Sequence, residues 1–488
     1  AISVRAADRT VDELVMPRAL IAETLAALSR PSLARARIIF RGRLGSGRRT
    51  FAATLAGAAN RQLGLIDMTL LGDPGARPIA LREAMIDALL RGLLPCIDGI
   101  SDAESLDGGD RDQLRKLFRD HPGPLAFRMP PDAVPPLDPG YVMVDIPRLS
   151  ETERIAVWER VAAEHKLTID DPARLASRFR VGPGIAWQVC SAVAERAGDS
   201  AAGDITADLD AELRQHIQNR LSVVATRVTR LATWSQIVLP EDIMDSLREL
   251  ISRVRHRRTV FEDWGMGEKM STSRGLTVLF QGPPGTGKTL VAGVIASELS
   301  LDLYRIDVSR ILSKWIGETE RNLAAVFDAA EDGQAIILFD EADSLFAKRT
   351  EVRSSVDRYA NLEVNYLLQR LDSFEGIALL TTNFAGSIDR AFQRRMSLRL
   401  QFPFPDEDMR EQIWRAHLPP ELPTAGDFDF AELAQKYRIS GGYIRNAALR
   451  AAFLAADEAT ALTQEHLERA VSLEYREVGK LSDSGALE

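Results

Sequence analysis

The chain has 488 residues, of which 45% are apolar and 27% charged, and its formal net charge is −9. This length and composition predict a globular protein of about two to four domains, and the acidic balance weakly opposes a dedicated nucleic-acid binder. The two cysteines, Cys96 and Cys190, form neither a metal motif nor a disulfide framework, so we expect buried thiols in a reducing compartment. No apolar run approaches the ~18 residues of a membrane helix, and the first residues show no signal-peptide pattern, so we expect neither a membrane span nor a leader. We therefore expect a cytoplasmic protein with no membrane partner.

The first half of the chain repeats features of the second half in the same order. Pairs of residues 20 apart recur (Gly47 and Asp67; Gly287 and Asp307), as do an arginine and a tryptophan four apart (Arg154 and Trp158; Arg410 and Trp414). Two longer stretches also align, namely Leu14–Pro17 with Ile237–Pro240 and Asp171–Arg180 with Asp429–Arg438. The order of these matches indicates a tandem duplication.

Small and acidic residues separate the two halves. Ala201–Asp210 has the composition of a linker, and Ala211–Ala232 is predicted as a connecting helix. We predict a first domain over 1–200, a linker with a connecting helix over 201–234, an α/β domain over 235–403 and a helical lid over 404–488.

The second half alternates strands and helices. Leu276–Phe280, Ala335–Phe339 and Ile377–Thr381 are apolar runs of strand type, and a helix is expected over Thr289–Leu299. Strands alternating with helices predict a parallel sheet covered on both faces. Beyond Pro405 the expected elements are helical, namely Asp406–Ala416, Asp429–Tyr437, Tyr443–Ala456 and Gln464–Glu474.

A glycine-rich loop follows the first of these strands and opens the helix. Gly282-Pro283-Pro284-Gly285-Thr286-Gly287-Lys288-Thr289 satisfies G-x-x-x-x-G-K-[ST], and Leu290 follows it. The glycines let backbone N–H groups surround phosphate oxygens at the positive end of a helix. Lys288 is expected to contact the β- and γ-phosphates of ATP, and the Thr289 hydroxyl to ligate Mg²⁺.

Polar residues stand at the ends of the next two apolar strands. Asp340 and Glu341 follow one strand and Asn383 follows the other. We expect Asp340 to hold Mg²⁺ through water, Glu341 to polarise the attacking water and Asn383 to orient it.

The order of these motifs resembles the AAA family of AAA+ ATPases. The resemblance implies that Arg394 or Arg395 acts as an arginine finger on a neighbouring subunit's γ-phosphate, without deciding between the two. It further implies a ring, usually a hexamer, because such a site is incomplete in a monomer. Arg445, in Gly442-Tyr-Ile-Arg445, matches an arginine of the family's lid that touches the nucleotide, or is a surface charge.

The same resemblance covers a loop that grips polypeptide in the ring's central pore. Ser313–Glu320 matches that loop, with Lys314, Trp315 and Ile316 at its tip, and Thr350–Asp357 is a candidate for a second pore loop. Asp357–Leu368 resembles bacterial AAA proteins encoded beside phage-tail-like contractile injection systems.

The first copy of the module lacks the catalytic residues. Arg48 and Arg49 stand where Lys288 and Thr289 stand, because Gly42–Arg49 occupies the position of the phosphate loop. Arginine does not replace lysine geometrically. The expected counterpart of the acidic strand is Leu93–Asp98, which is followed by Gly99 in place of a base. Trp187 stands where Arg445 stands, and no arginine pair precedes Pro147. We therefore predict a degenerate first module that does not hydrolyse ATP and serves ring assembly or partner binding, and residual nucleotide binding there is left open as the alternative.

The leading hypothesis is an ATP-hydrolysing, ring-forming remodeller or unfoldase that threads a protein substrate through its pore, with a role in assembling or loading a contractile injection particle as a narrower form. A nucleic-acid motor or loader is the alternative, since Arg253, Arg255, His256, Arg257 and Arg258 form a basic run. A third possibility is a scaffold whose assembly is controlled by ATP.

Overall fold

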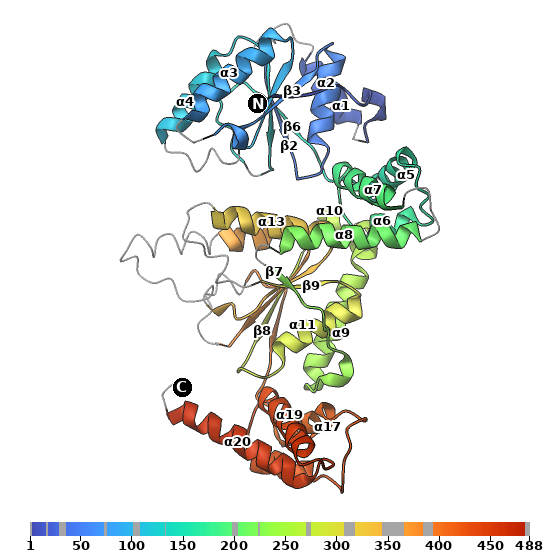
Figure 1. Ribbon diagram of the computed structural model, residues 1–488, viewed down its shortest axis with the longest axis vertical. Helices are drawn as coiled ribbons and strands as arrows, with labels where there is room; N and C mark the ends of the chain where they lie inside the picture. Colours follow the sequence, from blue (N-terminus) through green and yellow to red (C-terminus); the bar gives the residue numbers. More distant parts are fainter. Residues whose placement is uncertain are drawn as a thin grey trace. The chain divides into compact units, whose positions relative to one another are not determined.

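The computed structural model describes residues 2–15, 18–28, 36–72, 76–100, 108–131, 133–197, 204–222, 225–269, 275–306, 318–343, 366–383 and 394–483 (Figure 1). The chain divides into two compact units, Ala1–Ile217 and Gln218–Glu488. Each unit contains one mostly parallel sheet flanked by helices, and a group of helices follows each sheet in the chain. The predicted fold class, two tandem α/β modules with a helical part at the C-terminus, is confirmed.

The described residues of the first unit form six strands, namely β1 (Ile2–Arg5), β2 (Arg37–Arg41), β3 (Leu63–Asp67), β4 (Leu94–Asp98), β5 (Leu125–Met129) and β6 (Val142–Asp145). Its helices are α1 (Arg18–Leu28), α2 (Arg48–Ala58), α3 (Arg77–Leu90), α4 (Gly108–Asp120), α5 (Glu151–Glu164), α6 (Pro172–Arg178) and α7 (Pro183–Ala197). Helix α8 (Ile205–Leu221) crosses the division between the units.

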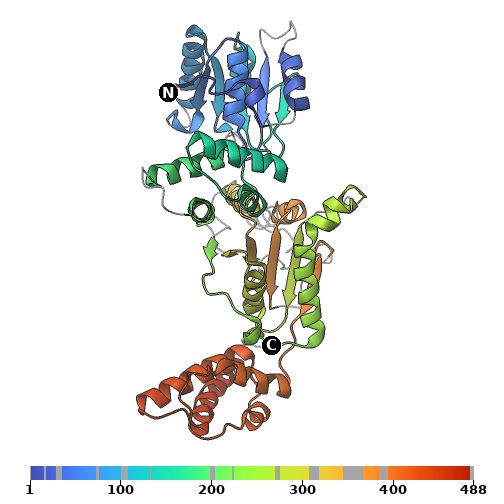
Figure 2. The same cartoon turned by 90° about the vertical axis from the view of Figure 1, so that its right-hand side faces the viewer.

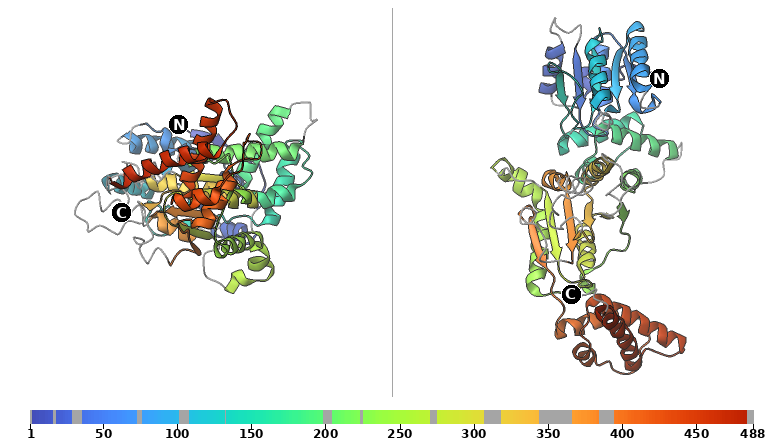
Figure 3. Two further views of the ribbon diagram at one scale, coloured as in Figure 1. Left: turned by 90° about the horizontal axis from the view of Figure 1, so that it is seen from below. Right: turned by 90° about the vertical axis from the view of Figure 1, so that its left-hand side faces the viewer.

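The sheet of the second unit consists of β7 (Ala225–Arg227), β8 (Leu276–Gln281), β9 (Leu303–Ile306), β10 (Ile336–Phe339), β11 (Ile377–Thr382) and β12 (Leu398–Gln401). The helices up to β10 are α9 (Glu241–Arg255), α10 (Met266–Lys269), α11 (Lys288–Leu299) and α13 (Glu318–Asp332). The C-terminal helices are α17 (Glu407–His417), α18 (Phe430–Lys436), α19 (Gly441–Asp457) and α20 (Gln464–Asp483), drawn in red in Figures 2 and 3. The helices and strands predicted for this half are confirmed with ends that differ by one or two residues, except that α20 continues to Asp483 where the prediction ended at Glu474.

The two sheets have the same topology. Their strand orders are β1-β3-β4-β5-β2-β6 and β7-β9-β10-β11-β8-β12. Each sheet is parallel except for its first strand, since β1 pairs antiparallel with β3 and β7 pairs antiparallel with β9. This one-to-one correspondence supports the duplication inferred from the sequence.

The helical parts of the two units share the same hydrogen bonds. In the second unit, the buried Arg410 donates to the carbonyls of Ala434 and Pro405 at 2.6–2.8 Å. In the first unit, Arg154 donates to the carbonyls of Ala176 and Leu149 at 2.9 and 2.7 Å. The arginine that recurs in the two halves therefore ties the same three segments together in each copy.

The segment between the modules differs from the one predicted. We expected one helix over Ala211–Ala232, but α8 ends at Leu221 and Ala225–Arg227 forms strand β7. The strand is held at the sheet edge by its pairing with β9 and by an ion pair of 2.7 Å between Arg227 and Asp302. Helical propensity thus gives way to the backbone hydrogen bonds that an open sheet edge offers.

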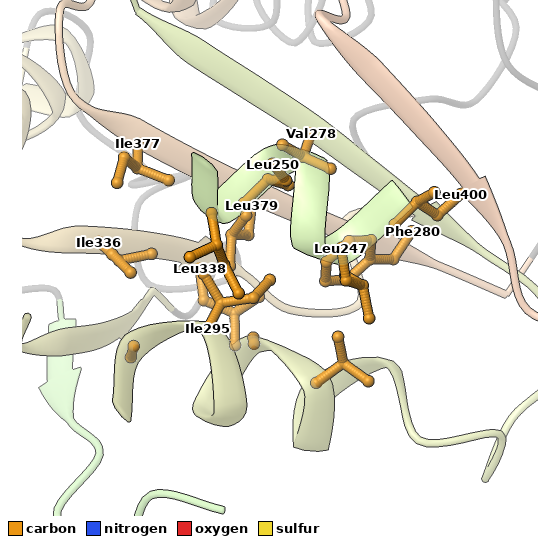
Figure 4. Packing of buried hydrophobic residues seen from close by; sticks show 14 of the residues in the cluster. Leu247, Leu250, Val278, Phe280, Ile295, Ile336, Leu338, Ile377, Leu379 and Leu400 are labelled. Atoms are coloured by element: carbon orange, nitrogen blue, oxygen red, sulfur yellow. The ribbon is translucent and has the colours of Figure 1, made fainter. Parts of the chain in front are cut away.

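Apolar residues cover both faces of the second sheet. Helices α9 and α11 pack on one face, where Leu247, Leu250 and Ile295 approach Val278, Phe280, Ile336, Leu338, Ile377, Leu379 and Leu400 (Figure 4). Side chains alternate between the two faces along a strand, so the strand residues between these point to the opposite face of the sheet. There Phe327 of α13 contacts Phe339, with ring centroids 6.0 Å apart. Burial on both faces explains why these strands are apolar along their whole length.

Both cysteines are buried and unpaired, as predicted. Burial raises the pKa of each thiol to about 12, which keeps both protonated at neutral pH. Within the described residues, no helix is both long enough and apolar enough to cross a lipid bilayer.

Candidate functional site

The glycine-rich loop lies between β8 and α11, and its shape depends on three glycines. Gly285 and Gly287 have φ values of +75° and +92°, a left-handed conformation that glycine adopts without a steric penalty. A Cβ on Gly282 would lie 2.3 Å from the carbonyl oxygen of Phe402. Gly287 is the N-cap of α11, so the loop ends with the free N–H groups of a helix N-terminus. Such a loop is a ready cradle for phosphate oxygens.

Lys288 begins this helix and is buried. Its ammonium donates to the carbonyls of Gly282 and Pro283, at 2.7 and 2.8 Å, and to Asn383 Oδ1 at 2.9 Å. Burial lowers the pKa of Lys288, and nearby carboxylates, led by Asp343, oppose that shift. The structure therefore brings together the predicted lysine and the predicted asparagine.

Asp340 lies at the end of β10, and two hydroxyl groups contact it. Thr289 Oγ1 donates to Asp340 Oδ1 at 2.9 Å, and Thr381 Oγ1 donates to the same oxygen at 2.8 Å. The predicted metal ligands, Thr289 and Asp340, are thus neighbours. Hard oxygen ligands of this kind suit Mg²⁺, which binds few protein groups and takes its other ligands from phosphates and water.

Glu341 adopts an unusual backbone conformation. Its φ is +53°, in the left-handed region that non-glycine residues rarely occupy. Its N–H donates to Thr381 Oγ1 at 2.9 Å, which fixes the turn, and the residue is exposed. Backbone strain at a single carboxylate beside a phosphate loop points to a functional side chain.

Asn383 is positioned by a second acidic residue. Asp343 Oδ1 accepts hydrogen bonds from the N–H of Asn383, at 3.1 Å, and from the Thr382 hydroxyl. The Asn383 amide, bound to Lys288 on its other side, is therefore held at the end of β11.

A cavity of about 300 Å³ joins these groups to the helical lid. The Gly442 N–H of α19 donates to the Gly285 carbonyl at 2.9 Å, which ties the lid to the loop. Arg445, one helical turn further on, lines this cavity and donates to Asn446 Oδ1 at 3.2 Å. The predicted site residues that line the cavity are Pro284, Gly285, Thr286, Gly287, Lys288, Thr289, Leu290, Asp340, Glu341, Asn383 and Arg445.

The two predicted finger arginines differ in their surroundings. Arg395 Nε donates to Asp372 at 2.7 Å, in an ion pair whose two side chains are 39% and 44% exposed. Arg394 is exposed, and no described residue accepts a hydrogen bond or forms an ion pair with it. Neither arginine lines this cavity of its own chain.

The predicted pore residues Lys314, Trp315 and Ile316 lie outside the described residues, as does the second pore segment, Thr350–Asp357.

In the first unit, the counterparts of the acidic site residues have a different chemistry. The registers of the paired strands place Asp98, Gly99 and Arg128 where the second unit has Asp340, Glu341 and Thr381. Asp98 is bound by Arg128 at 3.0 Å, and Gly99 has a φ of +78°. The left-handed turn is thus kept in both copies, but only the second copy carries a carboxylate on it.

The lysine position also differs between the two units. Arg48 begins α2 after the N-cap Gly47 and donates to the Met129 carbonyl. Burial and the nearby Arg128 lower its pKa to about 10. Gly184 donates to the Gly45 carbonyl at 2.9 Å, as Gly442 does to Gly285, so that Trp187 is placed as Arg445 is.

The basic run at the C-terminal end of α9 and just beyond it is largely engaged by acceptors within its own unit. Arg253 pairs with Glu249 at 2.6 Å and Arg255 with Glu298 at 2.6 Å, and Arg257 donates to the Glu375 carbonyl.

Two residues of the site, Thr381 and Asp343, were not predicted from the sequence. Both stand beside predicted residues in the chain, in Thr381-Thr382-Asn383 and Asp340-Glu341-Ala342-Asp343. The hydroxyl in the strand next to the acidic strand was the available signal, because adjacent parallel strands end at the same edge of the sheet.

Comparison with known proteins places this site in a family. Residues 278–404 match the model of the ATPase family associated with various cellular activities (AAA). Protein CdcH of Halobacterium salinarum is 32% identical over 237 residues, which are 47% of this chain and 30% of that protein. The 26S proteasome subunit RPT4 of Saccharomyces cerevisiae is 31% identical over 252 residues, 50% of this chain and 56% of that protein.

Katanin p60 ATPase-containing subunit A1 of Strongylocentrotus purpuratus is 34% identical over 192 residues, which are 36% of each chain. The chain thus spans about half or less of the length of these relatives. The matched residues contain the ends of the three strands that carry the loop, the acidic pair and Asn383. The second unit therefore contains an ATPase domain of the AAA family.

Proposed function

We propose that this chain is an ATP-hydrolysing, ring-forming AAA+ remodeller that draws a protein substrate through a central pore. The observation that carries the proposal is the cavity in the second unit, where the glycine loop, Lys288, Asp340, Glu341 and Asn383 meet.

Three residues are assigned to binding ATP and its metal. Lys288 supplies the buried positive charge that binds the phosphate chain, and it moves from the loop carbonyls onto phosphate oxygens. Thr289 and Asp340, which lie within hydrogen-bond distance of each other at the end of β10, would hold Mg²⁺. When bound, Mg²⁺ neutralises phosphate charge during the transfer.

Two further residues are assigned to the water that attacks the γ-phosphate. Glu341 projects a carboxylate from a turn fixed by Thr381 and acts as the general base. Asn383, held by Asp343, orients the water and contacts the γ-phosphate. The lid is coupled to this chemistry through Gly442, because its N–H is bonded to the loop itself.

The active assembly is proposed to be a ring, with a hexamer as the expected form. The site has a base and a lysine, but neither Arg394 nor Arg395 lines its own cavity. An arginine from a neighbouring subunit supplies that charge in the proposed ring. We assign the principal finger to Arg394, because Asp372 already binds Arg395.

Polypeptide is proposed to be the substrate on the basis of the pore-loop motif around Trp315. Two relatives support this choice by name, since one is a 26S proteasome subunit and another is the proteasome-activating nucleotidase 1 of Haloferax volcanii, 28% identical over 249 residues. A narrower form of the proposal places the activity in the assembly or loading of a contractile injection particle. It rests on the resemblance of Asp357–Leu368 alone.

The nucleic-acid alternative loses support from the structure of α9. Phosphate binding needs cations that are available to an anion, whereas Arg253 and Arg255 are each paired with a carboxylate.

We also propose a cytoplasmic location.

The test of threading compares Trp315→Ala with Trp315→Phe in the full chain. We expect the alanine variant to lose unfolding of a tagged, fluorescent model substrate while it keeps most of its basal ATP hydrolysis. The phenylalanine variant keeps an aromatic grip and should retain substantial unfolding. Unfolding that survives in the alanine variant contradicts threading. ATP hydrolysis stimulated by DNA and sensitive to salt favours the nucleic-acid motor, and ATP-dependent assembly without any remodelling favours the scaffold.

A further inference from the structure

The first unit keeps the backbone of a phosphate loop although it has lost the catalytic residues. Gly45 and Gly47 have φ values of +78° and +89°, close to the +75° and +92° of Gly285 and Gly287. The loop leads into an 11-residue helix, α2, whose N-cap is Gly47. The N–H groups that surround phosphate oxygens in the second unit therefore have counterparts here.

Around this loop, the first unit has arginines where the second unit has the lysine and the two threonines of its site. Arg48 stands in place of a lysine, and Arg49 and Arg128 stand in place of the two hydroxyl groups, those of Thr289 and Thr381, that contact Asp340. We call Arg48, Arg49 and Arg128 the arginine triad. Its members line one cavity of about 800 Å³.

The triad leaves no carboxylate available for a divalent cation. Asp98, the counterpart of the metal-binding Asp340, is bound by Arg128 at 3.0 Å. The described carboxylates that line the cavity are engaged as well, since Asp8 is bound by Arg5 and Glu164 by Arg9, and Glu13 accepts hydrogen bonds from the N–H and the hydroxyl of Thr10. An ion that enters the loop end of this cavity meets fixed cations, so an anion is favoured there and Mg²⁺ is not.

A second, independent observation points to an anion. The Arg128 side chain is only 10% exposed, and its Nε and Nη1 atoms are buried without a hydrogen-bond partner among the described residues. The Ser46 hydroxyl, within the loop, is likewise buried without a partner there. A buried guanidinium with two unmatched nitrogens is costly unless an acceptor reaches it. Phosphate oxygens are such acceptors, and arginine binds them with two parallel N–H groups.

Beyond the loop, the same cavity is lined by apolar side chains, which suit the organic part of a phosphate-bearing ligand. Val157 and Val161 line it from α5, as Ile413 and His417 line the second cavity from α17. Leu14 also lines the cavity, and it belongs to the segment Leu14–Pro17 that aligns with Ile237–Pro240. An apolar wall thus follows a cationic end, the arrangement that suits a nucleoside phosphate.

We propose that the first unit binds a chain of two or more phosphate groups, without a divalent metal and without hydrolysing it. The arginine triad supplies the charge that Mg²⁺ supplies in the second unit. Gly99 stands where the second unit has the base Glu341, so no carboxylate is positioned to activate water.

The test measures binding to the full chain carrying Lys288→Ala, which removes the charge that binds phosphate in the second unit. Isothermal titration is performed in excess EDTA with ADP and, separately, with inorganic pyrophosphate. We expect one site per chain in EDTA, and the same affinity within about twofold when Mg²⁺ is restored. Binding of ADP well above that of pyrophosphate identifies a nucleotide as the ligand, and equal binding identifies the phosphate chain alone.

Two single substitutions test whether the arginine triad forms the binding site. Arg49 is exposed and has no ion pair among the described residues, so Arg49→Gln should leave the fold intact. It should weaken binding about tenfold or more, because one charge-assisted contact is lost. The matched control is Arg82→Gln, on the exposed side of α3 and away from the cavity, which should change the affinity less than about twofold.

Absence of binding by both ligands in EDTA overturns the proposal, as does binding that requires Mg²⁺. Equal affinities of the Arg49→Gln and Arg82→Gln proteins also overturn it. Thermal unfolding of each variant, recorded without ligand, checks that a loss of binding is not a loss of folding.

Discussion

The left-handed turn after the acidic strand offers a direct test of the idea that Glu341 is kept for chemistry at the expense of stability. Glu341 has a φ of +53°, and its counterpart in the degenerate unit is Gly99, with a φ of +78°. A non-glycine residue in this region costs about 1–2 kcal/mol relative to a right-handed one. Glycine loses about 0.5–1 kcal/mol more backbone entropy on folding, which offsets part of that gain.

The change to make is Glu341→Gly, with Glu341→Gln as its matched control. Both variants lose the carboxylate, but only glycine releases the strain, so their difference isolates the backbone. We expect the glycine variant to be more stable by about 0.5–1 kcal/mol, or roughly 1–4 °C in Tm for a unit of this size. Differential scanning calorimetry of the full chain, without nucleotide, measures the shift without stabilisation by bound ligand.

The reverse change supplies a second control. Gly99→Ala should destabilise the first unit by about 1–2 kcal/mol, since the new Cβ enters a left-handed position. That Cβ would also lie 3.2 Å from Thr69 Cγ2 and 3.3 Å from Asp67 Oδ1. If Glu341→Gly unfolds at the same or a lower temperature than Glu341→Gln, the strain argument is wrong.

Two further predictions concern arginines of the second unit. Arg394→Lys should reduce ATP hydrolysis by the assembled protein about 100-fold or more. Arg395→Lys should reduce it less, because Arg395 is engaged by Asp372. Equal losses in phosphate-release assays would refute the assignment of Arg394 as the principal finger. Arg410→Met should lower the free energy of unfolding by about 2–4 kcal/mol, because it leaves buried carbonyls without a donor. The matched change Arg253→Met removes an exposed i,i+4 pair with Glu249 and should cost less than about 0.5 kcal/mol. Similar urea midpoints for the two variants would show that the buried hydrogen bonds of Arg410 do not contribute the expected stability.

The parts of the fold that were predictable depend on local patterns. The phosphate loop and the three buried strands of the second unit could be read from short segments, because the loop needs its glycines and the strands are buried on both faces. The repeat was detectable because residues such as Arg410 and Arg154 make the same structural hydrogen bonds in each copy.

The edge strands β1 and β7 were not predicted, and their sequences explain why. Ile2–Arg5 and Ala225–Arg227 are short, partly exposed and of mixed polarity. Each is a strand because a sheet edge far along the chain accepts it. No property of the segment alone carries that information.

Within the site, contacts between the ends of different strands escaped the sequence analysis. Thr381 and Asp343 act by contacting Asp340 and Asn383, and these contacts follow from the register of neighbouring strands. The same register replaces Thr381 by Arg128 in the first unit. The loss of Lys288 from that unit was visible in the sequence, whereas the gain of a buried, partly unmatched guanidinium was not.

The central claim is that one site, centred on Lys288, Asp340 and Glu341, accounts for all ATP hydrolysis by this chain. The most direct test is the steady-state rate of phosphate release by the full-length Glu341→Gln protein in ATP and Mg²⁺. We predict that the rate falls at least about 100-fold, to the limit of detection, because the general base is removed and the first unit has none. A rate within about tenfold of the parent protein would contradict this account.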